Sequence, residues 1–177
     1  MKSLIASITI LGLAGMMVAV GAGAATESSV TATVTAQNIS VSVSDGSVVY
    51  GTLAVNTSKD TTPTGVHNTQ VATNDGNITE SLNIKGANST SAGAGWTLAD
   101  SAGSEQYKHE FCTSGAGSSD PCDTTPSYTV LTTDYQSLAT SVGTSGTQRF
   151  DLQITTPTAT TDFNEQTVTV TVQAVAS

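Results

Sequence analysis

The two cysteines are the residues of this chain whose type and spacing most directly suggest chemistry. Cys112 and Cys122 enclose a loop rich in Gly and Ser. An even pair of cysteines is typical of a disulfide when a chain is exported, as the leader described below indicates. The alternative is a metal site that adds His109 or Asp120, but metal sites usually have the tighter Cys-x-x-Cys spacing. We therefore predict a disulfide between Cys112 and Cys122.

Catalytic groups do not form a pattern in the sequence. His67 lies in a polar stretch, and His109 alternates with Tyr107 and Phe111, which indicates packing rather than catalysis. The sequence contains no Gly-x-Ser-x-Gly, no His-Glu-x-x-His and no glycine-rich phosphate loop. The acidic residues are numerous enough that some pair would lie close together in any fold. We predict that the chain is not an enzyme, and a small exported hydrolase is the alternative.

Acidic turns are the remaining candidates for binding chemistry. Calcium prefers carboxylate and carbonyl oxygens, and four aspartates in turn-like stretches could supply them: Asp45, Asp75, Asp120 and Asp123. None of these turns has the spacing of a known calcium loop, and Asn, Asp and Gly are also ordinary turn formers. The only tryptophan, Trp96, is expected in the core, although exposed aromatic residues could instead form a sugar-stacking platform.

The N-terminus has the three parts of a secretory signal peptide. Lys2 provides the positive charge, an apolar run extends from Leu4 to Val20, and Ala22 and Ala24 fit the small-residue rule for cleavage. We predict a signal peptide over residues 1–24 and a single secreted domain over residues 25–177. The alternative is an uncleaved membrane anchor, since the run is almost long enough to span a bilayer. After removal of the leader, no segment is expected to cross a membrane.

The charge balance excludes one class of partner. The chain has five Lys and Arg residues against fourteen Asp and Glu residues, and its net charge is −9. The basic residues are scattered, so phosphate backbones would be repelled and nucleic acid is not an expected partner. Ser and Thr dominate the composition, and together with recurring Val and Ile they favour strands and turns over helices or mucin-like disorder.

Alternating segments separated by turn residues predict about nine or ten strands and no helix beyond the leader. Such a pattern predicts an all-β fold, a two-layer antiparallel β-sandwich of immunoglobulin-like or jelly-roll-like type, after an N-terminal signal helix. The clearest predicted strands beyond the first are residues 48–53, 69–73, 78–85, 95–99, 107–111, 128–131, 135–142, 150–154 and 167–172.

The first segment of the mature chain alternates for longer than one strand usually lasts. Its first half places Val30, Ala32, Val34 and Ala36 on one face. The apolar positions then change parity across residues 37–38, which predicts a bulge or bend before the second half. We expect the first half to pair with the C-terminal strand at residues 167–175. The alternative is that it leaves to pair with a neighbouring copy, as edge strands can.

Two resemblances to known families follow from these features. The phrase Gly95-Trp96-Thr97-Leu98, after a loop of small residues, resembles the Trp-x-Leu (WxL) cell-surface proteins of bacteria. The overall plan is similar to camelysin-type and biofilm-matrix fibre proteins, which have a signal peptide, an immediate strand and one Ser/Thr-rich sandwich. In those fibres an N-terminal segment completes a neighbouring subunit. The resemblance implies a surface or matrix role and no catalytic residues.

These observations together predict a non-catalytic structural protein, secreted or held at the cell surface. Assembly with itself through the N-terminal strand goes with the alternative in which that strand pairs with a neighbouring copy. Its expected partners are cell-surface or matrix components and further copies of the chain. The alternative function is an adhesin-like module that binds glycan or calcium. No cofactor is expected, apart from calcium under that alternative.

Overall fold

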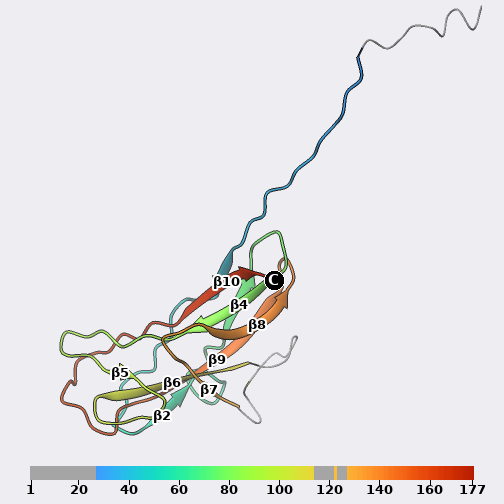
Figure 1. The fold of residues 1–177 in the computed structure, drawn as a ribbon. Coiled ribbons are helices and arrows are strands. Elements are labelled where there is room, and N and C mark those ends of the chain that lie inside the picture. The colour runs from blue at the N-terminus through green and yellow to red at the C-terminus, as the bar shows by residue number, and fades with distance from the viewer. Residues whose placement is uncertain (1–26, 114–121, 123–126) are drawn as a thin grey trace, which may run out of the picture. The chain divides into compact units, whose positions relative to one another are not determined.

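The structure is a computed structural model that describes residues 27–113, 122 and 127–177. The chain divides into two compact units, Met1–Thr35 and Ala36–Ser177, and the strands all belong to the second. The described residues form ten strands in two sheets and no helix, which confirms the predicted all-β sandwich (Figure 1). The signal helix and the cleavage residues Ala22 and Ala24 lie outside the described residues.

The larger sheet has seven strands, and five of them form a continuous path. Their order is β1 (Val41–Val43), β3 (Gln70–Asn74), β9 (Thr147–Thr155), β6 (Gln106–Thr113) and β5 (Thr97–Leu98). Two further strands pair off this path: β2 (Ser58–Asp60) with β9, and β7 (Thr129–Val130) with β6. All of these pairs are antiparallel except β5 and β6, which run parallel.

The smaller sheet has three antiparallel strands in the order β10 (Thr171–Ala176), β4 (Glu80–Lys85) and β8 (Gln136–Val142). Strand β4 alternates strictly, and its inward residues Leu82 and Ile84 are fully buried. Strand β10 does not alternate so regularly, and its Val172 and Ala174, which pack against the core, are only half-buried. The sheet is therefore well covered at its centre and less covered at its β10 edge.

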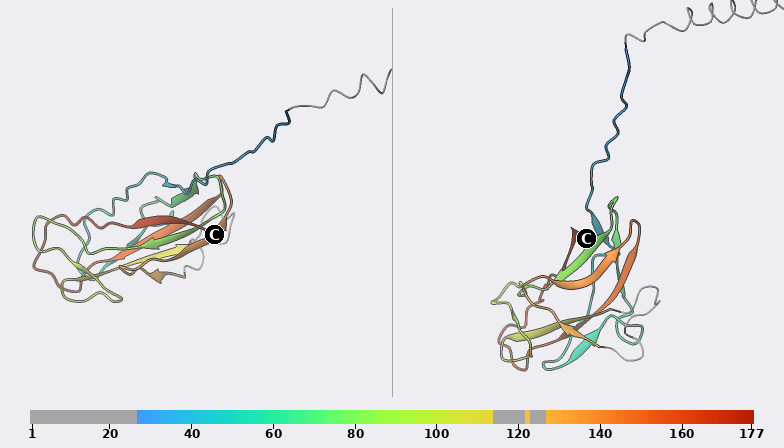
Figure 2. Two further views of the ribbon diagram at one scale, coloured as in Figure 1. Left: turned by 45° about the horizontal axis from the view of Figure 1, so that its top comes forward. Right: turned by 45° about the vertical axis from the view of Figure 1, so that its right-hand side comes forward.

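The core lies between the two sheets. Figure 2 shows the ribbons of these sheets from two further sides. Leu82 and Ile84 of β4 pack with Phe111 of β6 and with Phe150 and Leu152 of β9. The remaining buried members of this cluster are Ala72, Leu131 and Leu138. Since burial of a large apolar side chain stabilises a fold by about 1.5–3 kcal/mol, this cluster is the main source of stability.

Most predicted strands are confirmed, and three features differ. Residues 48–53 form no strand, because Gly51 has a φ of 77° and Tyr50 turns to His109 instead of joining a ladder. Strand β2 was not expected from its polar sequence Ser-Lys-Asp, and it forms because β9 extends past β3 and offers it a partner. The C-terminal strand begins at Thr171, later than the predicted 167.

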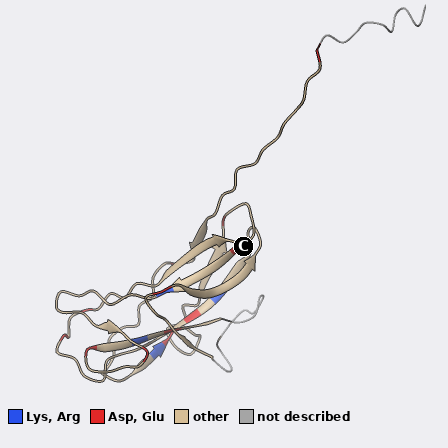
Figure 3. Ribbon diagram, in the orientation of Figure 1, with Lys and Arg blue, Asp and Glu red and all other residues tan. Residues whose placement is uncertain are grey.

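Charged residues are sparse over the described part of the fold. Figure 3 shows a ribbon that is mostly uncharged, with Lys and Arg at a few separate positions. The ion pair between Lys108 and Glu110 on β6 has a nitrogen–oxygen distance of 2.8 Å. This arrangement agrees with the absence of a basic patch in the sequence.

Candidate functional site

The N-terminal unit exposes apolar residues. Its described residues, 27–35, form no strand. The side chains of Val30 and Val34 are 93% and 96% exposed, and Ala32 is exposed as well. No ladder is formed by residues 27–35, and the one ladder of β10 is with β4, so the expected pairing of this segment with the C-terminal strand stays a prediction. In an extended conformation Val30, Ala32 and Val34 would share one face, and among the described residues no strand pairs with them.

The second half of the opening stretch does enter the fold. Val41–Val43 is strand β1, which pairs antiparallel with β3 at the edge of the larger sheet. Ala36 belongs to the same unit, and its carbonyl accepts a hydrogen bond of 2.8 Å from Nδ2 of Asn77. The change of apolar parity at residues 37–38 therefore lies close to the boundary between the exposed segment and the folded unit.

Two edge strands meet along one side of the sandwich. Strand β1 is the edge of the larger sheet, β10 is the edge of the smaller sheet, and the two lie next to each other. Apolar side chains along this line pack against the core but stay half-buried. We call this line the seam, and its members are Val41, Val43, Val48, Val170, Val172 and Ala174.

The seam also has free backbone groups. Strand β10 forms its ladder with β4 on one side, and its other side has no ladder partner among the described residues. Residues 168–170, which precede β10, are outside any strand. An edge strand with unpaired N–H and C=O groups is a template for a further strand. The seam therefore combines half-buried apolar side chains with an open hydrogen-bonding edge.

The two candidate calcium residues that the structure describes do not come together. Asp45 and Asp75 are both exposed, and they follow opposite ends of the paired strands β1 and β3. Asp120 and Asp123 lie outside the described residues. Within ranges 27–113 and 127–177 and at Cys122, no three His, Cys, Asp or Glu side chains are grouped so that they could hold a metal ion.

The predicted disulfide between Cys112 and Cys122 is confirmed. Cys112 lies in β6, and both residues are buried. Because each sulfur is bonded to the other, neither is a free thiolate for the metal site that the sequence left as an alternative. A disulfide of this kind is typical of proteins in an oxidising compartment rather than the cytoplasm.

The two histidines occupy different environments. His67 is exposed, whereas His109 is fully buried beside Tyr107 and Tyr50. Nε2 of His109 lies 3.1 Å from the hydroxyl of Tyr50. Desolvation lowers the pKa of His109 to about 4, and burial raises the pKa of Tyr50 above its usual range. His109 is therefore a neutral packing residue at physiological pH, as its alternation with aromatic residues indicates.

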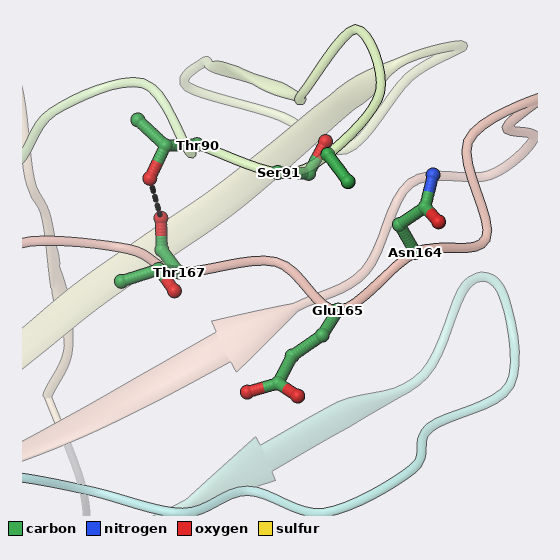
Figure 4. Close-up of a pocket in the computed structure, with 6 residues that line it drawn as sticks. Thr90, Ser91, Asn164, Glu165 and Thr167 are labelled. Atoms are coloured by element: carbon green, nitrogen blue, oxygen red, sulfur yellow. Dashed lines mark hydrogen bonds between the residues drawn. The ribbon is translucent and has the colours of Figure 1, made fainter.

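A shallow pocket of about 400 Å³ lies between two loops (Figure 4). Thr90, Ser91 and Ala92 line it from one loop, and Asn164, Glu165 and Thr167 line it from the other. The two loops are joined by backbone hydrogen bonds of 2.8 Å in both directions between Thr90 and Thr167. The lining is therefore polar and built from backbone segments that are fixed to one another.

Asp162 organises the same pair of loops. Its carboxylate accepts hydrogen bonds from Ser91 Oγ at 2.5 Å and from the backbone N–H of Gly95 at 3.0 Å. It also accepts bonds from Asn164 and Gln166. These donors hold the pKa of Asp162 below its usual range. The sequence pointed to none of these residues, because a single Asp in a Thr-rich loop has no distinctive spacing.

Aromatic residues near this pocket differ in exposure. Trp96 is half-buried, and its indole N–H donates to Thr160 Oγ1 at 3.0 Å. Its ring also lies 6.4 Å from that of Tyr107, but it is not among the buried core residues, so it lies at the border of the interior rather than in the expected core. Phe163, by contrast, is 81% exposed and immediately precedes the pocket residues Asn164 and Glu165.

No protein-family model, curated protein or solved structure matches this chain. The structure therefore defines the class of fold, a two-sheet β-sandwich with a disulfide and an open seam, and the resemblance to WxL and fibre proteins stays a prediction. Across the described part of the chain, no helix has the length and hydropathy needed to cross a membrane.

Proposed function

We propose that this chain is a non-catalytic structural protein of the cell surface or extracellular matrix, and that it assembles when the N-terminal segment of one copy joins the seam of another. The observation that carries this proposal is the near-complete exposure of Val30 and Val34 on an extended segment. Such residues are normally covered, and here the described chain provides no strand partner for them.

The chemistry of the segment suits the seam. In an extended strand, Val30, Ala32 and Val34 point to one face and the intervening Thr residues to the other. The seam offers half-buried Val side chains and the free edge of β10. Strand addition would satisfy backbone groups and bury both valines, which is worth roughly 3–6 kcal/mol for the pair.

Export is the second part of the proposal. The sequence pattern of residues 1–24 is that of a signal peptide. The disulfide supports an oxidising compartment, where a fibre or surface layer would form. Further copies of the chain are the principal partner that we propose, together with other cell-surface or matrix components.

The test compares two double variants of the mature chain, residues 25–177. Val30→Asp with Val34→Asp places charges on the apolar face, while the matched control, Thr31→Asp with Thr33→Asp, adds the same charge to the opposite face. Size-exclusion chromatography with light scattering and electron microscopy should show assemblies for the natural chain and for the control, and monomers for the valine variant. A natural chain that stays monomeric at all concentrations, or a valine variant that assembles equally well, contradicts the proposal.

A second candidate function is glycan binding, as an adhesin. It rests on the exposed ring of Phe163, which directly precedes Asn164 of the pocket in the chain, and on the hydrogen-bonding side chains of Thr90 and Ser91 in that pocket, because an exposed ring combined with hydrogen-bonding groups suits a sugar. Screening the mature protein on a glycan array, with Phe163→Ala as the comparison, tests it. Glycan signals that persist unchanged in the variant, or no signal for the natural chain, would exclude this site.

A further inference from the structure

The turn between β3 and β4 is hydrogen-bonded to the residues that directly follow the exposed segment. Two backbone bonds join them: Asp75 N–H donates to Ser40 O at 2.8 Å, and Asn77 N–H donates to Asn38 O at 3.1 Å. The carboxylate of Glu80, which is fully buried, accepts from Ser40 N–H at 2.9 Å. Residues 36–40 form no strand, so these bonds are their main attachment.

The side chain of Asn77 adds two bonds that a backbone turn alone could not make. Its Oδ1 accepts from Asn38 N–H at 2.8 Å, and its Nδ2 donates to Ala36 O at 2.8 Å. One amide group thereby spans three consecutive residues of the passing chain. The last of these bonds is at Ala36, the residue at which the folded unit begins.

Gly76 permits this close approach. A Cβ at this position would lie 2.4 Å from Asn38 O and 2.2 Å from Glu80 Oε1, distances that real side chains do not adopt. The turn itself is fixed from behind, because Nδ2 of the buried Asn74 donates to Ile78 O at 2.8 Å and to Val142 O at 2.9 Å. The C-terminus is held here too, since Ser177 N–H donates to Thr79 O at 3.3 Å.

We propose that Asn74–Glu80 is a clamp that holds residues 36–40 against the folded unit to which they belong. It thereby leaves no free linker between this unit and the exposed N-terminal segment, residues 27–35. Asn77 and Gly76 are its positioning residues. In an assembly, a segment that is docked through Val34 in the seam of a neighbouring copy would be followed directly by the residues that the clamp holds. The joint between successive subunits is then short and stiff. This role in the joint rests on the proposed assembly, whereas the clamp itself does not.

The first arm of the test measures the clamp without reference to assembly. Hydrogen exchange of the mature chain, followed by mass spectrometry, should show rapid exchange in peptides covering residues 27–35 and protection in those covering 36–41. Asn77→Ala and Gly76→Ala should each speed exchange of the 36–41 peptides roughly tenfold, because hydrogen bonds are lost. Thr79→Ala, an exposed change in the same turn, is the matched control and should leave the exchange unchanged. Equal exchange of the two regions in the natural chain overturns the clamp.

The second arm measures the joint. Fibres of the natural chain and of Thr79→Ala should have the same persistence length in electron micrographs, while Asn77→Ala fibres should form but bend more. Asn77→Ala fibres as stiff as the natural ones overturn the stiff joint, even if exchange shows the clamp. If no variant forms fibres while exchange still shows protection at 36–41, the clamp stands and the proposed assembly, with its joint, fails.

Discussion

Acidification below pH 6.5 should destabilise this protein through His109. Burial lowers the pKa of His109 from 6.5 to about 4, with desolvation as the cause. The unfolded chain therefore binds more protons than the folded chain between these two values. The free energy of unfolding is then fully present above pH 6.5 and falls as the pH is lowered towards 4.

The size of the effect follows from the shift. One pKa unit corresponds to about 1.4 kcal/mol, so the shift of His109 removes about 3 kcal/mol of stability across this window. That is a large share of the stability of about 5–15 kcal/mol that is typical of a native domain. The neighbours of the ring are Tyr50 and Tyr107, both of which stay neutral in this range because burial raises the pKa of each.

Urea unfolding at a series of pH values between 7 and 4, followed by the fluorescence of Trp96, measures this slope. His109→Gln keeps a side chain that can form a hydrogen bond with Tyr50 but does not titrate, so its slope should be much smaller. His67→Gln, at an exposed position, should behave as the natural chain does. Equal slopes for the natural chain and His109→Gln would refute the reasoning.

Three further predictions concern packing, the disulfide and the pocket. Leu82→Ala should cost about 3 kcal/mol in urea unfolding, because the side chain is fully buried and leaves a cavity; a loss below 1 kcal/mol would mean that the site is not packed as the structure shows. Cys112→Ser with Cys122→Ser should lower stability by about 2–3 kcal/mol, because a loop with a sequence separation of 10 is no longer closed; this is checked by melting curves, with the reduced natural chain expected to match. Phe163→Ala should leave the free energy of unfolding within about 0.5 kcal/mol of that of the natural chain, since the ring is exposed; a clear loss of stability would show that it packs.

The alternation of apolar and polar residues within single segments predicted most strands of the fold. Alternation of Leu82 and Ile84 with polar neighbours predicts a half-buried strand, because side chains on a strand point to opposite faces in turn. The same reasoning located β6, β8 and β9. It was wrong at residues 48–53, where the left-handed φ of Gly51 interrupts the run, and at β2, where the partner strand decides pairing rather than the residues themselves.

The candidate sites were less accessible to such reasoning. The sequence placed Asp75 in a turn-like stretch, but the bonds of the neighbouring Asn77 to Ala36 and Asn38 join residues far apart in the chain. Asp162 likewise joins two loops through Ser91 and Gly95. A pattern within one segment carries no information about which distant backbone group will lie opposite.

The sequence by itself determined the strand-rich class of this protein, its leader pattern, its disulfide pair and the amphipathic character of the first segment, because all of these depend on residue type and local spacing. Only the tertiary structure decided that Val41–Val43 enters the fold while Val30 and Val34 stay exposed. It also decided that β1 and β10 leave a seam where the two sheets meet. Strand pairing is chosen among distant segments by what each can bury, and that competition is settled by the whole chain.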